Sequence, residues 1–216
     1  MAVAKRTRND PRREATRTAL IEAAESLFAE GGVEGVSTRQ IGAAIGSANA
    51  NVVAYHFGGK EELIKAVYRH RLPEIDRRRG ELLDEADAAG TSGDIAVLVR
   101  IFFQPFLEQT DGHGHHSYAR FVAGMERSGL FALRGQLLDE FPETNRLNDR
   151  IGALLPQSGE ADYRLRQRLV VGLMSTAFLL IDREAAGDAT LAREHFEKAI
   201  AMAAAAMAAP SPANPD

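Results

Sequence analysis

The sequence predicts an all-α fold, in which a three-helix, helix-turn-helix unit precedes a larger helical region. Apolar residues recur at i, i+3, i+4 and i+7 through most of the chain, which is the spacing of one helix face. Helix-start signals stand where this spacing begins, as in Asp10-Pro11 and in the S-x-x-Q sequence of Ser37 and Gln40. Glycine pairs and prolines separate the periodic segments, as expected for consecutive helices.

Composition limits the classes of protein that the chain can represent. The 216 residues include no cysteine, so thiol catalysis, disulfides and cysteine-based zinc sites are excluded, and a reducing cytoplasm is the expected location. No apolar signal region opens the chain and no segment is long enough to span a bilayer. The first 80 residues hold 14 Lys/Arg against 10 Asp/Glu, whereas the remainder holds 12 against 20. A basic N-terminal end on an acidic body favours a nucleic-acid partner for that end.

The N-terminal segment carries most of the basic residues that could meet DNA. Residues 1–9, with Lys5, Arg6 and Arg8, are predicted to be a flexible arm that either follows DNA or only solubilises the chain. The first helix begins after Asp10 and ends at Gly31-Gly32, and its early arginines either bind phosphate or form a solvated face; these are Arg12, Arg13 and Arg17.

Two short helices joined by a tight turn follow. The Ser37–Gln40 capping box begins a helix at Thr38, and Gly46 ends it, because glycine adopts the left-handed conformation that a helix end requires. Asn49 is predicted to cap the second helix. The inner faces of the two helices are expected to pack together through Ile41, Ile45, Val53 and Phe57. The outer face of the second helix is left small and polar, which suits a recognition helix in a DNA groove.

The run from Ser37 to Leu63 resembles the DNA-binding signature of TetR/AcrR-type transcriptional repressors. The shared pattern is T-x-x-I, a glycine, and then V-x-Y-H-F-G-x-K-E-E-L. The resemblance covers about the first third of the chain. It implies an all-helical homodimer that binds a near-palindromic operator and responds to a small molecule, acting as a regulator and not as an enzyme.

The resemblance also implies which side chains meet DNA. Thr38 and Arg39, which open the supporting helix, would touch the DNA backbone. Asn49, Ala50 and Asn51, at the start of the recognition helix, would read bases or flanking phosphates. Tyr55, His56 and Lys60, near its end, would bind phosphates. Asn51 is the first choice for an adenine edge. The turn is G-S-A-N in place of the commoner G-V-S, so the register of the recognition helix stays open by one residue. Ala54 replaces an aromatic residue that is frequent there.

The predicted boundary between the DNA-binding domain, residues 10–60, and the helical domain, residues 61–209, lies at the start of a long connecting helix. Glu61 and Glu62 suit its first turn, and Pro73 is expected to kink or interrupt it. The basic cluster Arg77–Arg79 is expected to form a solvated face.

The second domain is predicted to bind a small molecule of unknown identity, and no cofactor is expected. Helices over Ile95–Glu108 and Ser117–Ser128 bring together aromatic and sulfur side chains that either line an apolar cavity or belong to the ordinary core. The candidates for ligand contact are Phe102, Phe106, Tyr118, Phe121, Met125 and Phe178. Arg120 or His116 would supply a polar end.

The last two helices are predicted to form a dimerisation surface, although packing within one chain is the alternative. The first spans Ala161–Ala186 and the second is capped by Thr190. Stripes of apolar and small residues would meet in an intersubunit four-helix bundle. They comprise Leu169, Leu173, Thr176, Leu180, Phe196, Ile200, Ala203 and Met207. Residues 210–216 are expected to be a disordered tail.

The loop with His113, His115 and His116 raises the question of a metal site, but only Asp111 accompanies it, so solvent-exposed histidines without a metal are expected. Two other functions remain open. One alternative is a helical small-molecule-binding protein or enzyme that uses the C-terminal cavity. The other is a protein–protein adaptor. In both, the helix-turn-helix would be only structural.

Overall fold

The computed structural model describes residues 10–130, 132–155 and 159–210, and within these ranges it contains helices and no strand. The all-α prediction is therefore confirmed. The predicted arm, residues 1–9, and residues 211–216 of the predicted tail lie outside the described residues. The helices are α1 (Pro11–Gly35), α2 (Thr38–Ala44), α3 (Val52–Phe57), α4 (Lys60–Ala88), α5 (Ile95–Leu107), α6 (Ser117–Arg127), α7 (Ala132–Gly135), the 3-10 helix η1 (Leu138–Glu140), α8 (Pro142–Ala153), α9 (Glu160–Glu184) and α10 (Ala189–Ala208).

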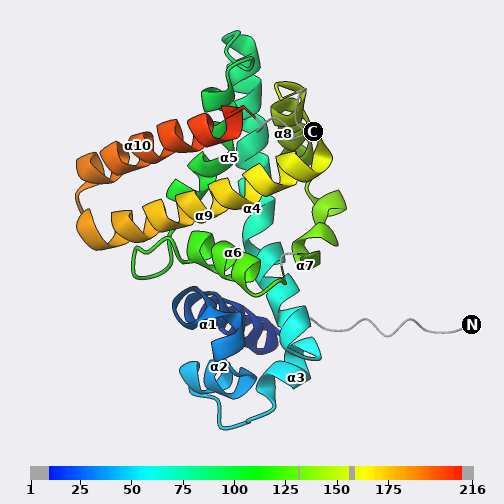
Figure 1. The fold of residues 1–216 in the computed structure, drawn as a ribbon. Coiled ribbons are helices and arrows are strands. Elements are labelled where there is room, and N and C mark those ends of the chain that lie inside the picture. Colours follow the sequence, from blue (N-terminus) through cyan, green and yellow to red (C-terminus); the bar gives the residue numbers. More distant parts are fainter. Residues whose placement is uncertain (1–9, 131, 156–158, 211–216) are drawn as a thin grey trace, which may run out of the picture.

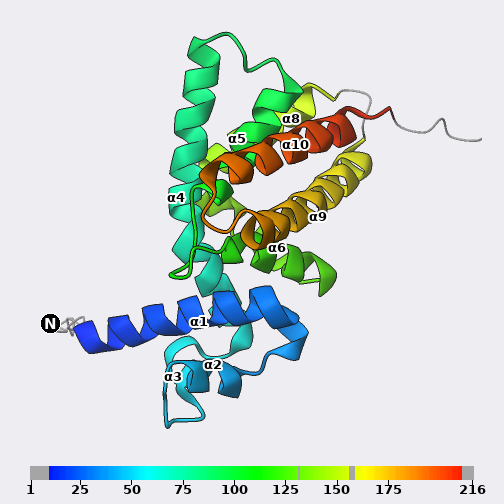
Figure 2. The same cartoon turned by 90° about the vertical axis from the view of Figure 1, so that its left-hand side faces the viewer.

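The helices form two parts, which we call the head and the body. The head consists of α1, α2 and α3 with the first turns of α4, and the body consists of α5 to α10 with the rest of α4 (Figure 1). Helix α4 runs from the head to the far end of the body, and α9 and α10 lie side by side as an antiparallel pair (Figure 2). Helix α6 lies across α1, so the body meets the head both through α4 and through the α1–α6 contact. None of the described helices combines the length and apolar character needed to cross a bilayer.

Local signals explain where the helices of the head begin and end. The side chain of Asp10 accepts a hydrogen bond from the Arg12 main-chain nitrogen at 3.1 Å, as predicted for a capping aspartate before Pro11. The segment Pro11–Gly35 is broken at Gly32, whose φ of 71° only glycine adopts at little cost. The Ser37 capping box is present in full, and Gly46 has the expected left-handed conformation with φ of 71°. The starts of α1 and α2 are therefore confirmed.

Two predicted caps are wrong. Helix α3 begins at Val52 and not directly after Asn49, because Asn49 uses its side-chain oxygen to accept the Asn51 main-chain nitrogen at 2.9 Å and so closes a turn before the helix. Helix α10 is capped by Asp188, whose carboxylate accepts from the nitrogens of Thr190 and Leu191. Because Asp188 is the capping residue, Thr190 lies inside the first turn of the helix.

Pro73 does not interrupt the connecting helix, which continues without a break for 29 residues. Its ring is exposed, while Leu72 and Ile75 on either side are buried. The burial of these neighbours offsets the helix bond that the proline removes.

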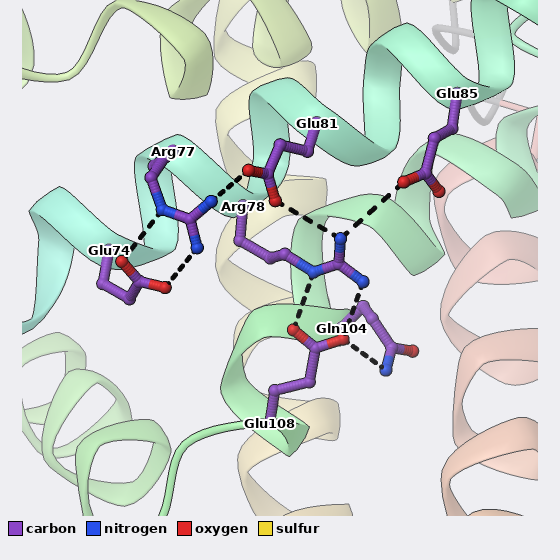
Figure 3. Close-up of polar contacts among 7 residues, drawn as sticks. All are labelled: Glu74, Arg77, Arg78, Glu81, Glu85, Gln104 and Glu108. Carbon is purple, nitrogen blue, oxygen red and sulfur yellow. Dashed lines mark hydrogen bonds and ion pairs between the residues drawn. The ribbon is translucent and has the colours of Figure 1, made fainter.

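Ion pairs on the outer side of α4 add links along the helix and to α5 (Figure 3). Arg77 pairs with Glu74 and Glu81 within α4, and Arg78 reaches Glu108 of α5 with 3.0 Å between Nε and Oε2. These side chains are at least 30% exposed, so each pair contributes little to stability.

Arg79 corrects the prediction of a solvated arginine cluster. Its side chain is only 1% exposed and points into the body, unlike Arg77 and Arg78. Its guanidinium donates to the Phe102 main-chain oxygen at 2.8 and 3.1 Å and to Oγ1 of Thr144 at 2.9 Å. It also lies over the Phe102 ring, 4.0 Å from the centroid. Arg79 therefore joins α4 to α5 and α8 inside the core.

Candidate nucleic-acid interface

The helix-turn-helix is built by close packing of α2 on α3. Ile41 and Val53 are fully buried between the two helices. Gly42 allows the close approach, because a Cβ there would lie 2.9 Å from Cγ1 of Val52. Arg17 of α1 holds the C-terminal end of α3, because its Nη1 donates a hydrogen bond to the main-chain oxygen of His56 at 2.6 Å.

The outward side of α3 carries the residues that sequence reasoning placed at DNA. Ala50, Asn51, Ala54 and Tyr55 are exposed, and the Tyr55 side chain is 68% exposed. A tyrosine this exposed on a helix of six residues offers a hydroxyl to a partner outside the chain. The structure thus brings the small, amide and phenolic side chains together on one surface, which we call the α3 face.

The supporting residues lie at the edge of the α3 face. Arg39 is exposed in the first turn of α2, and Thr38 beside it is half-buried. Asn49 is exposed, but its side-chain oxygen is already used in the turn before α3. A DNA contact by Asn49 would have to use its amide nitrogen.

His56 lies between the α3 face and α1. Burial lowers the pKa of its imidazole below the usual value, and the positive charges of Arg13 and Arg17 lower it further, while Glu14 opposes them. The ring meets Tyr55 edge to face, with 5.0 Å between centroids. At neutral pH the imidazole is therefore uncharged, and it would reach a phosphate as a hydrogen-bond donor and not as a cation.

Lys60 has partners inside the head. Its ammonium donates to the main-chain oxygens of Val33 and Val36 and lies 5.6 Å from the centroid of the Phe28 ring. Burial lowers the pKa of this ammonium, against the attraction of Glu34. The lysine therefore joins the start of α4 to the segment between α1 and α2. The phosphate contact that the resemblance implied for it stays a prediction.

Arg17 contacts α3 inside the head, a role that the sequence did not indicate. It is one of three arginines for which the sequence left phosphate binding and a solvated face open, and its phosphate contact stays a prediction. Besides its bond to His56, its guanidinium lies over the Phe57 ring, 4.4 Å from the centroid. Its position at the C-terminal end of α3 is also the favourable one for a cation. Only a tertiary contact between α1 and α3 reveals this role.

The apolar cavity predicted in the body is present but small. Four of the six predicted ligand residues line it, namely Phe102, Phe106, Tyr118 and Phe178. The space enclosed is about 20 Å³, which is room for about one water molecule. A second cavity of about 30 Å³ lies beyond Phe102 and Phe103. A larger ligand requires these aromatic side chains to move apart.

Phe121 and Met125 do not line either cavity. Both are fully buried, and the Phe121 ring stacks on Phe28 of α1 with 6.1 Å between centroids. Neither side chain borders the enclosed space, so their contact with a ligand stays a prediction. The polar wall is supplied by Arg79 and Ser175, and neither Arg120 nor His116 lines the cavity.

The apolar stripes of the last two helices differ in exposure. On α9, Leu169 is 64% exposed and Leu180 42% exposed, Thr176 is exposed and Leu173 is half-buried. The predicted stripe of α10 instead faces the core of its own chain, since its four residues are at most 2% exposed: Phe196, Ile200, Ala203 and Met207. These four are corrected to core residues. The exposed side of α10 carries Met202, which borders a groove shared with Leu173 and Leu180.

The histidine loop separates into two kinds of residue. His115 is about half exposed, whereas His116 is buried, so the prediction of a solvent-exposed histidine is wrong for His116. Its Nδ1 lies 2.5 Å from a carboxylate oxygen of Asp182. Across the described residues, no group of three histidine, aspartate or glutamate side chains is arranged to hold a metal ion.

A short helix that is packed on a capped partner helix, with a small and polar outer face, defines a helix-turn-helix protein of the DNA-binding class. Comparison with known families agrees: residues 20–67 match the model of bacterial regulatory proteins of the tetR family. The head therefore carries the DNA-binding domain of the TetR family of transcription regulators, and the resemblance is confirmed there. No curated protein matches the chain.

Proposed function

We propose that the protein is a homodimeric, ligand-responsive repressor that binds a near-palindromic operator. The exposed α3 face is the observation that carries the proposal. An exposed phenol and an alanine on the helix, with an exposed alanine and amide directly before it, fit a major groove. The proposed contacts comprise Thr38 and Arg39 at the backbone, Asn49, Ala50 and Asn51 at bases or flanking phosphates, and Tyr55 and His56 at phosphates. In this proposal residues 10–60 read DNA, and residues 61–209 bind the effector and form the dimer.

The exposed stripe of α9 supports the dimer. Leu165, Leu169 and Leu180 are all more than 40% exposed on one helix, and Met202 of α10 is 62% exposed beside them. Apolar side chains gathered in this way on adjacent helices favour burial against a second copy. Two-fold symmetry of the protein then requires two-fold symmetry of the operator.

The closed cavities support a response that depends on opening the body. Phe102, Phe106, Tyr118 and Phe178 come from three helices, so a ligand that enters between them must separate α5, α6 and α9. Helix α6 lies against α1 of the head. Movement of α6 would therefore change the position of the α3 face and release DNA.

Titration of a DNA duplex tests the proposal. The purified protein is titrated into the duplex that lies immediately upstream of its coding region, with a shuffled duplex as control, at two salt concentrations. We expect tighter binding to the native duplex. Asn51→Ala should bind it at least about fivefold more weakly, since a bidentate adenine contact is worth about 1–3 kcal/mol. Gln136→Ala, which changes an exposed amide of the body, is the matched control. Equal weak binding to both duplexes across a genomic duplex library would reject the proposed reading of DNA.

A further inference from the structure

A fully buried carboxylate joins the head to the body. Glu25 of α1 is 1% exposed, which is rare for a charged side chain. Arg71 of α4 donates to both of its oxygens, from Nε to Oε2 at 2.7 Å and from Nη2 to Oε1 at 3.0 Å. The Ser117 hydroxyl, at the first residue of α6, donates to Oε1 at 2.5 Å. One carboxylate therefore holds three helices, and only one of them, α6, belongs wholly to the body.

The residue before Ser117 is held by α9 in a corresponding way. The main-chain nitrogen of His116 donates to both oxygens of Asp182 at 3.2 and 3.1 Å, and the imidazole Nδ1 lies 2.5 Å from Oδ1. The Asp182 side chain is 4% exposed. The second ring nitrogen, Nε2, lies 3.2 Å from the main-chain oxygen of Leu107, where α5 ends. Two adjacent residues at the start of α6 thus connect a carboxylate of α9 with a carboxylate of α1.

This connection borders the cavity of the body. Tyr118 follows Ser117 directly and lines the cavity, and Phe178 lies one helical turn before Asp182 and lines it as well. The His116 and Phe178 rings are in contact, with 5.1 Å between centroids. Any molecule that separates Tyr118 from Phe178 must pull on the start of α6 from both sides.

We infer that the hydrogen bond from Ser117 to Glu25 is a positioning contact, through which α6 and α9 set the position of the DNA-reading head. The bond links the body to the helix that also carries Arg17, the residue that fixes the end of α3. Loss of the bond leaves the Arg71–Glu25 pair and the Phe28–Phe121 contact in place, so the head stays folded but loses its hydrogen bond to the start of α6. The inference on DNA rests on the proposed function, whereas the inference on the position of the head does not.

The substitution Ser117→Ala removes the hydroxyl and leaves both charges paired. Ser128→Ala is the matched control, because it also removes a serine hydroxyl from an end of α6, but one that donates to the Met125 main-chain oxygen of α6 itself at 3.1 Å. The chain has no cysteine, so Glu30→Cys at the exposed end of α1 and Ala88→Cys at the exposed end of α4 accept two spin labels without other changes. Mixing labelled with excess unlabelled protein restricts the measurement to distances within one chain.

We expect Ser117→Ala to broaden or shift the distance distribution between the two labels, while Ser128→Ala leaves it as in the parent protein. Superimposable distributions for all three proteins overturn the inference. In the double variant with Asp182→Asn, the changes in distance are expected to be non-additive, because both substitutions act on the start of α6. Additive changes overturn the link to α9.

Operator binding gives the second readout. We expect Ser117→Ala to bind the operator about three- to tenfold more weakly, as for the net loss of one typical hydrogen bond. The dependence on salt should be unchanged, because no phosphate contact is removed. A reduced salt dependence would show a direct DNA contact and overturn the positioning role. If the parent protein binds no operator, the proposed function fails, and the distance measurement still decides whether Ser117 positions the head.

Discussion

Arg17 donates a hydrogen bond from Nη1 to the main-chain oxygen of His56 at 2.6 Å, so the first helix of the head holds the C-terminal end of the recognition helix. The two residues are 39 positions apart in the sequence. A helix of six residues has too few internal bonds to be stable alone, and it depends on such external contacts for its orientation.

Replacing Arg17 by alanine is therefore expected to loosen α3 without touching the exposed α3 face. We expect the free energy of unfolding of the head to fall by about 1–2 kcal/mol, since a charged donor and a stacked guanidinium are lost. Hydrogen exchange of the amides of residues 52–57 measures the effect. Arg12→Ala, five residues earlier on α1 at an exposed position, is the control. Unchanged exchange in α3 would contradict the anchoring role.

His56 makes the stability of the head depend on pH in the mildly acidic range. Its pKa in the folded protein is lowered from 6.5, first by burial and then by Arg13 and Arg17. The unfolded chain therefore takes up the proton first, so this stabilisation is fully present above about pH 6.5 and is lost as the pH falls through the lowered pKa. We expect His56→Gln to reduce the pH dependence of the melting temperature between pH 5 and 6.5, as measured by circular dichroism. His70→Gln, at an exposed position on α4, should retain the slope of the parent protein.

The elements with strong local signals were predictable from the sequence. Ser37 with Gln40, Asp10 with Pro11, and Gly46 each act through bonds to near neighbours or through their own backbone freedom, and each lies where expected. Asn49 shows the limit of this reasoning. A turn and a helix cap use the same asparagine oxygen, and the sequence does not say which one prevails.

The sequence predicted the apolar faces of the helices better than it predicted which neighbour each face packs against. The apolar stripe of α10 is real, but a repeat of apolar residues is the same whether a helix faces its own core or a second copy, and Phe196 and Ile200 face the core. The arginines of α4 show the same limit. Arg79 lies on the buried face of α4 with Ile75 and Leu83, but its partners Phe102 and Thr144 are far along the chain, so their contacts were not predictable from the helix alone.

If the exposed leucines of α9 form the dimer interface, a charge placed among them should weaken the dimer. We expect Leu169→Glu to weaken self-association at least about tenfold, because a carboxylate would be buried against apolar side chains at the centre of the proposed interface. Sedimentation velocity over a range of concentrations measures the change. Leu154→Glu places the same charge on another exposed leucine, at the end of α8, and should leave assembly unchanged. Equal sedimentation of the two variants would place the interface elsewhere.

Substitution of Arg77 and of Arg79 compares an exposed with a buried arginine on the same helix, α4. Arg79→Met keeps an unbranched apolar stem but removes the guanidinium, which leaves the Phe102 oxygen and the Thr144 hydroxyl without their buried donor. We expect the free energy of unfolding to fall by about 2–3 kcal/mol, as for buried polar groups that lose a charged partner. Arg77→Met removes ion pairs to Glu74 and Glu81 that are open to water, so little change is expected. Urea denaturation followed by circular dichroism compares the two midpoints. Similar midpoints would mean that an apolar side chain replaces Arg79 without loss of stability, and would contradict the prediction.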